Sequence, residues 1–154
     1  MTYPDLSKII HIIGSIRMIL IVCLDSRNGM AFNGRRQSRD ARLVDDILDI
    51  VRDRPIYASS YTKRLFGERA EIRGGAKFMY NAGPGEFCFI ETKSVSTVSD
   101  RVEKLIIYRW NRHYLSDVYF DIDISEGFVL EDTYEFEGKS HPTITREVYV
   151  REKA

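Results

Sequence analysis

The sequence predicts an α/β domain with a mostly parallel central sheet, helices on both faces and an antiparallel C-terminal edge. Three observations lead to this prediction. A buried apolar strand is followed by alternating helical and strand patterns. The last third of the chain holds strand-forming segments separated by turn signals. The length of 154 residues suits one domain with one core.

The first predicted element is a strand over residues 18–25, because a short, continuous, β-branched apolar run is typical of a strand buried on both faces. Residues 26–39 contain two Asn-Gly pairs and many charges, which indicates a loop with turn chemistry. A helix is expected over residues 40–53, ended by Pro55. Its apolar face is Leu43, Val44, Ile47, Leu48 and Val51. Asp45, Asp46 and Asp49 are expected mostly on a solvated face.

The remaining elements follow from local pattern. We expect short strands at 56–59 and 70–80, the second broken by Gly74-Gly75, and a helical turn over 61–68. After a turn at 81–85 come a buried strand at 86–91 and a short helix over 92–103. Strand-forming residues then recur at 104–110, 118–124, 133–138 and 145–152. These last segments predict antiparallel hairpins.

The amino-terminal run is assigned separately. Residues 9–24 are strongly apolar but include His11 and Arg17, and a spanning helix needs about 20 apolar residues. No small-residue cleavage site follows, as a signal peptide would require. We therefore divide the chain into a lead of uncertain role, residues 1–17, and a domain over residues 18–154. Met18 is an alternative functional start.

Composition limits the classes of partner. Hydrophobic residues make up 44% and charged residues 30%, which is typical of a globular protein. The 23 basic and 23 acidic residues cancel, so no global field favours nucleic acid or an anionic membrane. Cys23 and Cys88 lie in apolar runs and are expected to be buried. The three histidines are scattered, so no metal is expected, and the protein is expected to be cytoplasmic.

Three stretches carry most of a resemblance to the dihydrofolate reductase family, and a C-terminal stretch adds to it. MILIVCLDSRNGMAFNGR (residues 18–35) is similar to its first strand and mobile active-site loop. The second stretch, RPIYASSYTKRLFG (54–67), resembles the family's segment of Lys-Pro, three apolar residues and Gly-Arg-x-Thr. The third, VEKLIIYRWNRHYLSDVYFDI (102–122), resembles a later strand and the loop that follows it. TREVYVREKA (145–154) matches its last strand. The resemblance implies a single-domain fold of that type, which binds dihydrofolate and NADPH in one cleft and transfers hydride between them.

The resemblance also implies site positions. Those for the substrate are Val22, Cys23, Leu43, Ile47, Phe89 and Tyr108. Those for the cofactor are Leu24, Thr62, Lys63, Arg64, Glu91 and Thr92. Tyr108 takes the place of a threonine that backs the family's carboxylate.

Four departures affect the chemistry that the resemblance implies. The apolar Leu-Pro-Trp of the lid is replaced by Arg35-Arg36-Gln37. Leu43 stands where the family has its acid. The family's Gly-Arg-x-Thr is replaced by Ser59-Ser60-Tyr61-Thr62, which keeps the threonine but lacks the arginine. Glu91-Thr92 follows the buried strand where the family has Gly-Gly, whose backbone approaches the cofactor. With another register, Gly74-Gly75 would be that pair.

Asp40 has two interpretations. Three positions before Leu43, it lies on the same helix face and could be a relocated catalytic acid. It also suits the N-cap of the helix, which is the commoner use of such a residue.

Two functional hypotheses remain. The first is a divergent dihydrofolate reductase fold, impaired in hydride transfer, that acts by binding a protein partner. Its candidate surfaces are the arginine-rich loop (Arg35, Arg36, Arg39) and the aromatic strand (Tyr108, Trp110). The second is an active NADPH-dependent reductase of dihydrofolate or a related heterocycle, with Asp40 as the acid. No serine–histidine–acid constellation is indicated by the spacing, and without hydride transfer no cofactor is expected.

Overall fold

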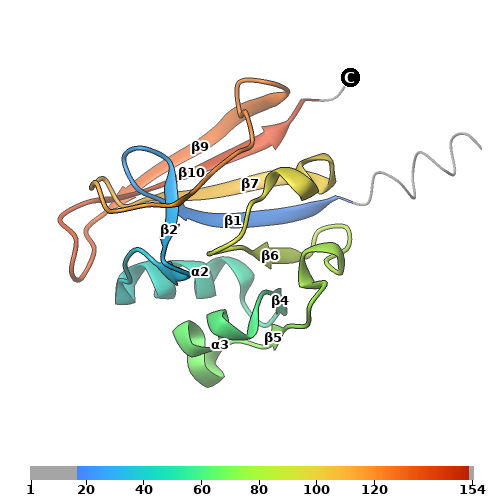
Figure 1. The fold of residues 1–154 in the computed structure, drawn as a ribbon, viewed down its shortest axis with the longest axis horizontal. Coiled ribbons are helices and arrows are strands. Elements are labelled where there is room, and N and C mark those ends of the chain that lie inside the picture. Colours follow the sequence, from blue (N-terminus) through green and yellow to red (C-terminus); the bar gives the residue numbers. More distant parts are fainter. Residues whose placement is uncertain (1–16, 153–154) are drawn as a thin grey trace, which may run out of the picture.

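The computed structural model describes residues 17–152 and contains a seven-stranded sheet in the order β5-β4-β6-β1-β7-β10-β9 (Figure 1). These strands are β1 (Met18–Leu24), β4 (Ile56–Tyr57), β5 (Ile72–Arg73), β6 (Phe87–Phe89), β7 (Val102–Arg109), β9 (Phe128–Phe136) and β10 (Ile144–Arg151). Pairing is parallel from β5 through β7, and β10 is antiparallel to both β7 and β9. The predicted fold class is confirmed. The predicted lead lies, except for its last residue, outside the described residues.

Strand β1 lies at the centre of the sheet because its side chains are apolar on both faces. Leu20 and Val22 point into one core cluster and Ile21 into the other, and all three are fully buried. Cys23 packs at the margin of the cluster that contains Ile21. A half-exposed strand alternates apolar and polar residues, but β1 is buried on both faces and its residues are therefore continuously apolar.

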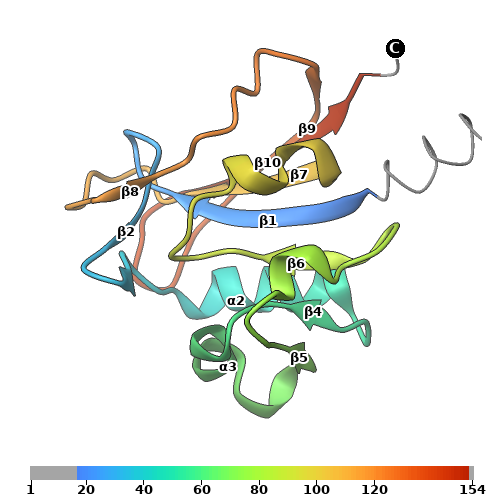
Figure 2. The same cartoon turned by 45° about the vertical axis from the view of Figure 1, so that its right-hand side comes forward.

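The two faces of the sheet are covered by different kinds of helix. Helices α2 (Ala41–Val51) and α3 (Ser60–Phe66) pack on the face of Ile21. The 3-10 helices η2 (Phe78–Tyr80) and η3 (Ser96–Arg101) pack on the other face, and η1 (Gly67–Arg69) follows α3. Figure 2 shows α2 and η3 on opposite sides of β1. The short helix expected over 92–103 is thus a 3-10 helix, which fits a Ser- and Thr-rich segment that favours turns over α-helix.

The segment after β1 forms a second, small sheet in the order β3-β2-β8. It contains β2 (Gly29–Phe32), β3 (Arg35–Arg36) and β8 (Val118–Tyr119). Asn33 and Gly34, at φ 53° and 73°, connect β2 to β3, and positive φ at both positions is typical of a tight hairpin turn. The expected turn is therefore present, but two short strands flank it. The strand expected over 118–124 is reduced to β8.

The strand expected over residues 70–80 was wrong in extent. Only Ile72–Arg73 pairs, and the chain then turns through Gly75, at φ 115°, into η2. Strand β5 is at the sheet edge, with β4 and β6 between it and β1. Gly74-Gly75 is therefore remote from the end of β6, and the alternative register in which it replaces Glu91-Thr92 is not supported.

Strands β9 and β10 form the antiparallel C-terminal edge. They pair from Ile144 with Phe136 through Arg151 with Phe128, with one irregularity between Val148 and Tyr149. Strand β9 is outermost, and residues 129–135 are exposed. Within residues 17–152, no helix has the length and apolar character to cross a membrane, and no group of three or more His, Cys, Asp or Glu residues is placed to hold a metal ion.

Candidate functional site

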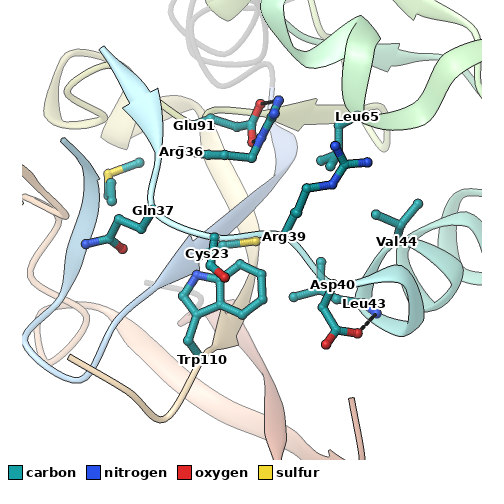
Figure 3. Close-up of a pocket in the computed structure, with 12 residues that line it drawn as sticks. Cys23, Arg36, Gln37, Arg39, Asp40, Leu43, Val44, Leu65, Glu91 and Trp110 are labelled. Carbon is teal, nitrogen blue, oxygen red and sulfur yellow. Dashed lines mark hydrogen bonds and ion pairs between the residues drawn. The ribbon is translucent and has the colours of Figure 1, made fainter. Parts of the chain in front are cut away.

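A small cavity lies where the carboxyl ends of β6, β1 and β7 meet the amino-terminal end of α2. Ligands of open α/β sheets bind outside the carboxyl ends of the strands, so this is the expected place for a site. Residues in its wall include Cys23, Arg36, Ser38, Leu43, Glu91 and Trp110 (Figure 3). Its volume is about 20 Å³. That space suits about one water molecule.

The carboxylate of Glu91 is held by two neighbours. Arg36 Nε and Nη2 donate to its two oxygens over 2.8 and 3.0 Å, and Thr62 Oγ1 donates to Oε2 over 2.8 Å. The side chains of Arg36 and Glu91 are only 16% and 7% exposed. A bidentate, shielded pair of this kind is among the strong interactions in proteins. It fastens β3 to the end of β6 and to α3.

Asp40 is the N-cap of α2. One of its oxygens accepts from the backbone N–H groups of Arg42 and Leu43, and its carboxylate also accepts from Lys139 N, Ser140 N and the Ser140 hydroxyl. Burial alone would raise the pKa of Asp40, but the hydrogen bonds from Lys139, His141 and Ser140 outweigh it and hold that pKa well below its usual range. The carboxylate is ionised and its acceptor sites are used. Its catalytic role stays a prediction.

The turn between β9 and β10 approaches Asp40 closely through Gly138. A Cβ at this position would lie 2.6 Å from Asp40 Oδ2 and 2.8 Å from the carbonyl oxygen of His141. A side chain there would push the turn away from the carboxylate. Glycine therefore allows residues 139–141 to reach the start of α2.

A serine, a histidine and a carboxylate meet at this junction. His141 Nδ1 lies 3.0 Å from Asp40 Oδ2, and His141 Nε2 lies 3.1 Å from Ser38 Oγ. The spacing of these residues in the sequence did not indicate this constellation. The reason is sequence distance, since His141 is about 100 residues from its partners and no local signal connects them.

Asp46, expected at the margin of the solvated face of α2, is more shielded than that place suggests, with its side chain 16% exposed. Tyr108 Oη donates to its Oδ2 over 2.6 Å, and Arg146 Nη1 contacts both oxygens at 2.8 and 2.7 Å. Burial, followed by the charge of Asp46, raises the pKa of Tyr108. In the family, a threonine at the position of Tyr108 supports the acid at the position of Leu43. In this chain Tyr108 instead binds the carboxylate of Asp46. This carboxylate is paired with a cation, so it does not suit the unpaired acid that the resemblance requires.

The predicted substrate positions separate into three groups. Cys23 and Leu43 line the cavity. Ile47, Phe89 and Tyr108 are buried in the core beside α2. Val22, like the predicted cofactor position Leu24, is on the opposite face of the sheet.

The predicted cofactor positions lie around α3 and the end of β6. Thr62 and Glu91 are joined by the hydrogen bond described above, and Thr92 follows, partly buried. Lys63 and Arg64 are exposed. Arg64 lines an open hollow of about 530 Å³. The other side chains of that hollow are Asn33, Arg35, Arg36, Arg39 and Tyr61.

The aromatic strand is not an exposed surface. Tyr108 is fully buried and Trp110 is 4% exposed. The Trp110 ring stacks on the His141 ring with centroids 4.6 Å apart. The prediction of a partner surface at these two residues was wrong, because α2 packs over Tyr108 and His141 of the β9–β10 turn stacks on Trp110.

The fold of this chain is similar to that of a solved structure. The chain is similar to a dihydrofolate reductase from Enterococcus faecalis complexed with NADP(H) and RAB-propyl, with a TM-score of 0.65 and 12% sequence identity over 89% of this chain and 97% of that chain. The chain has the dihydrofolate reductase fold. No family model and no curated protein matches its sequence. Because a fold at this identity does not fix an activity, function has to be argued from the site.

Proposed function

We propose that this protein uses the dihydrofolate reductase fold for binding and does not transfer hydride, and that an acidic segment of a protein partner docks on its arginine-rich loop. The observation that carries the proposal is the carboxylate of Glu91, held by Arg36 and Thr62 at the end of β6. The resemblance puts glycine backbone and a cofactor phosphate at this place. Here the Glu91 side chain, fastened by Arg36 and Thr62, fills the place where backbone would have to approach the phosphate.

NADPH and a pterin do not fit the residues present. The cavity beside Cys23 and Leu43 has a volume of about 20 Å³. Ligand pockets have volumes of roughly 300–1,000 Å³. Arg36 comes from the segment that forms the lid in the family, and here it lies in the cavity wall, paired with Glu91.

The hollow outside the ion pair supports an acidic partner. Arg35, Arg39 and Arg64 are exposed around it, and none of them forms an ion pair with a residue of the described part of the chain. Its lining includes no carboxylate. Three cations around one concave surface favour an anionic ligand even on a chain with zero net charge.

A first experiment tests the loss of reductase function. Thermal unfolding is recorded with NADPH, with dihydrofolate and with both, and NADPH oxidation is followed by absorbance. A ligand at 100 times its dissociation constant adds about 2.7 kcal/mol to the folded state. For this size of domain, at about 2–4 °C per kcal/mol, that is a rise of roughly 5–11 °C in the unfolding midpoint. We expect no shift and no oxidation. A shift with NADPH would favour the alternative, an active NADPH-dependent reductase, to which the NADP(H)-bound neighbour lends support.

A second experiment tests the acidic partner. A labelled oligoglutamate peptide is titrated with the protein, and its fluorescence anisotropy is measured at low and physiological salt. The triple variant Arg35→Ala, Arg39→Ala, Arg64→Ala should bind at least tenfold more weakly. The matched control removes three exposed charges elsewhere, with Arg27→Ala, Lys77→Ala and Arg112→Ala. Equal weakening in both variants would mean that only net charge matters, and would contradict a specific surface.

A further inference from the structure

The junction of Ser38, His141 and Asp40 has the geometry of a nucleophile, a base and an orienting acid. The hydrogen bonds run from Ser38 Oγ to His141 Nε2, 3.1 Å, and from His141 Nδ1 to Asp40 Oδ2, 3.0 Å. The two contacts use the two different nitrogens of the ring. This is the connectivity that activates a serine in acyl transfer, and it is recognised by geometry whatever the fold.

The surroundings orient the ring of His141. The carboxylate of Asp40 is fully shielded and accepts hydrogen bonds, so Nδ1 of His141 donates to it. With its hydrogen on Nδ1, the ring presents Nε2 as an acceptor to the hydroxyls of Ser38 and Tyr114, 3.1 and 2.9 Å away, as a general base requires. The ring is held in place by its stacking on Trp110 and is 2% exposed.

Ser38 is on the cavity side of this chain of hydrogen bonds. It is partly exposed and lines the cavity with Cys23 and Arg36. The Tyr114 hydroxyl lies 3.3 Å from Ser38 Oγ and 2.9 Å from His141 Nε2. Its single hydrogen serves either acceptor, and when it is donated to Ser38 Oγ the serine hydrogen is left to point toward Nε2. Tyr114 is therefore a positioning residue.

A donor for a developing oxyanion is also near. The backbone N–H of Arg39, the residue after Ser38, donates to no atom of the described residues. The N–H of the residue after the nucleophile is a common component of an oxyanion hole. The Arg39 side chain lines both the cavity and the outer hollow.

We propose that Ser38 is the nucleophile of an esterase site that accepts small acyl esters with an anionic group. Ser38 Oγ bonds to the carbonyl carbon and its proton passes to His141 Nε2. The bond to the leaving alkoxide breaks, and the alkoxide takes that proton and departs as an alcohol. Water then adds to the acyl-serine and gives a proton to Nε2. The acyl–Oγ bond breaks, Oγ recovers the proton, and a carboxylic acid is released.

The substrate class follows from the dimensions and charges of the site. A cavity of about 20 Å³ has no room for a long acyl chain, so the proposal is restricted to the smallest acyl groups, such as acetyl, presented at the cavity opening beside Ser38. Arg39 at its opening and Arg64 across the hollow attract a carboxylate or phosphate on the leaving-group side.

The test combines covalent labelling with turnover of an ester. The full chain is treated with a fluorophosphonate, the labelled residue is identified by mass spectrometry, and p-nitrophenyl acetate hydrolysis is measured across pH. We expect one label, on Ser38, and hydrolysis above the buffer rate. Ser38→Ala should lose both, and His141→Gln should lower turnover by at least about 100-fold. Ser125→Ala, an exposed serine remote from the cavity, is the control and should match the wild type.

The positioning role of Asp40 needs a readout other than folding. Asp40→Asn, with its folded state verified by circular dichroism, should lower turnover and change its pH profile, because an amide no longer fixes the tautomer. Folded wild-type protein that takes no label on Ser38 would overturn the proposal. So would hydrolysis that is equal in the wild type and in Ser38→Ala.

Discussion

The carboxylate of Asp40 offers the sharpest test of how the structure is stabilised, through the substitution Asp40→Ala. The change removes the N-cap of α2, which costs about 0.5–2 kcal/mol. It also leaves His141 Nδ1, buried and 2% exposed, without its acceptor, at about 1–3 kcal/mol. The N–H groups of Lys139 and Ser140 are near solvent and can be hydrated. The expected loss in the free energy of unfolding is therefore roughly 2–5 kcal/mol.

Urea unfolding followed by circular dichroism measures this loss, and an unchanged m-value shows that the same surface is exposed on unfolding. Asp45→Ala is the matched control. It is on the same helix, but its side chain is 56% exposed and pairs only with Arg69. An exposed pair contributes about 0–1 kcal/mol. If both variants lose the same small amount, the hydrogen bonds of Asp40 do not hold the β9–β10 turn to α2, and the reasoning is refuted.

The pH dependence of stability gives a second readout of the same carboxylate. The folded pKa of Asp40 is lowered, so its contribution is fully present above the unfolded value, about 3.9. It is lost as pH falls below that value toward the folded pKa. Asp40→Asn should therefore flatten the acid limb of the stability curve. An acid limb identical to that of the wild type would contradict the lowered pKa.

Two further predictions concern buried polar groups. Tyr108→Phe removes a hydrogen bond to the carboxylate of Asp46 and should lower the free energy of unfolding, measured by urea denaturation, by about 1.5–3 kcal/mol. Tyr80→Phe, at an exposed tyrosine, is the control and should have little effect. Burial raises the pKa of the Cys88 thiol to about 12 and raises the pKa of the Cys23 thiol as well. Their modification by a disulfide reagent should therefore be on the order of 1,000-fold slower in buffer than in urea, and fast reaction in buffer would show that the core opens readily.

Local patterns predicted the elements that depend on neighbours in sequence. The apolar run of β1 and the spacing of Leu43, Val44, Ile47 and Val51 determine which faces are buried, and those elements lie where expected. Asp40 as a cap also follows from its place before the first helical turn. These features involve contacts within a few residues.

Long-range contacts were not predictable in the same way. Asp46 was placed with its neighbours on a solvated face because nothing near it shows that Tyr108 and Arg146 come from two other strands. Ser38 and His141 meet only because the β9–β10 turn folds back on α2. The 70–80 strand failed for a related reason, since pairing beyond Arg73 would require a neighbouring strand that the sheet does not supply.

The outer strand β9 has a consequence for how copies of this protein behave together. Over nine residues it offers one row of main-chain groups at the sheet edge, whereas the opposite edge, β5, has only two residues. Such an edge is a template to which another chain can add. Glu131, Asp132 and Glu135 project from it and are exposed, so two approaching copies repel each other. These three acids therefore protect against aggregation. Replacing them with threonine should leave folding intact and turn a well-dispersed protein into one that assembles through its sheet.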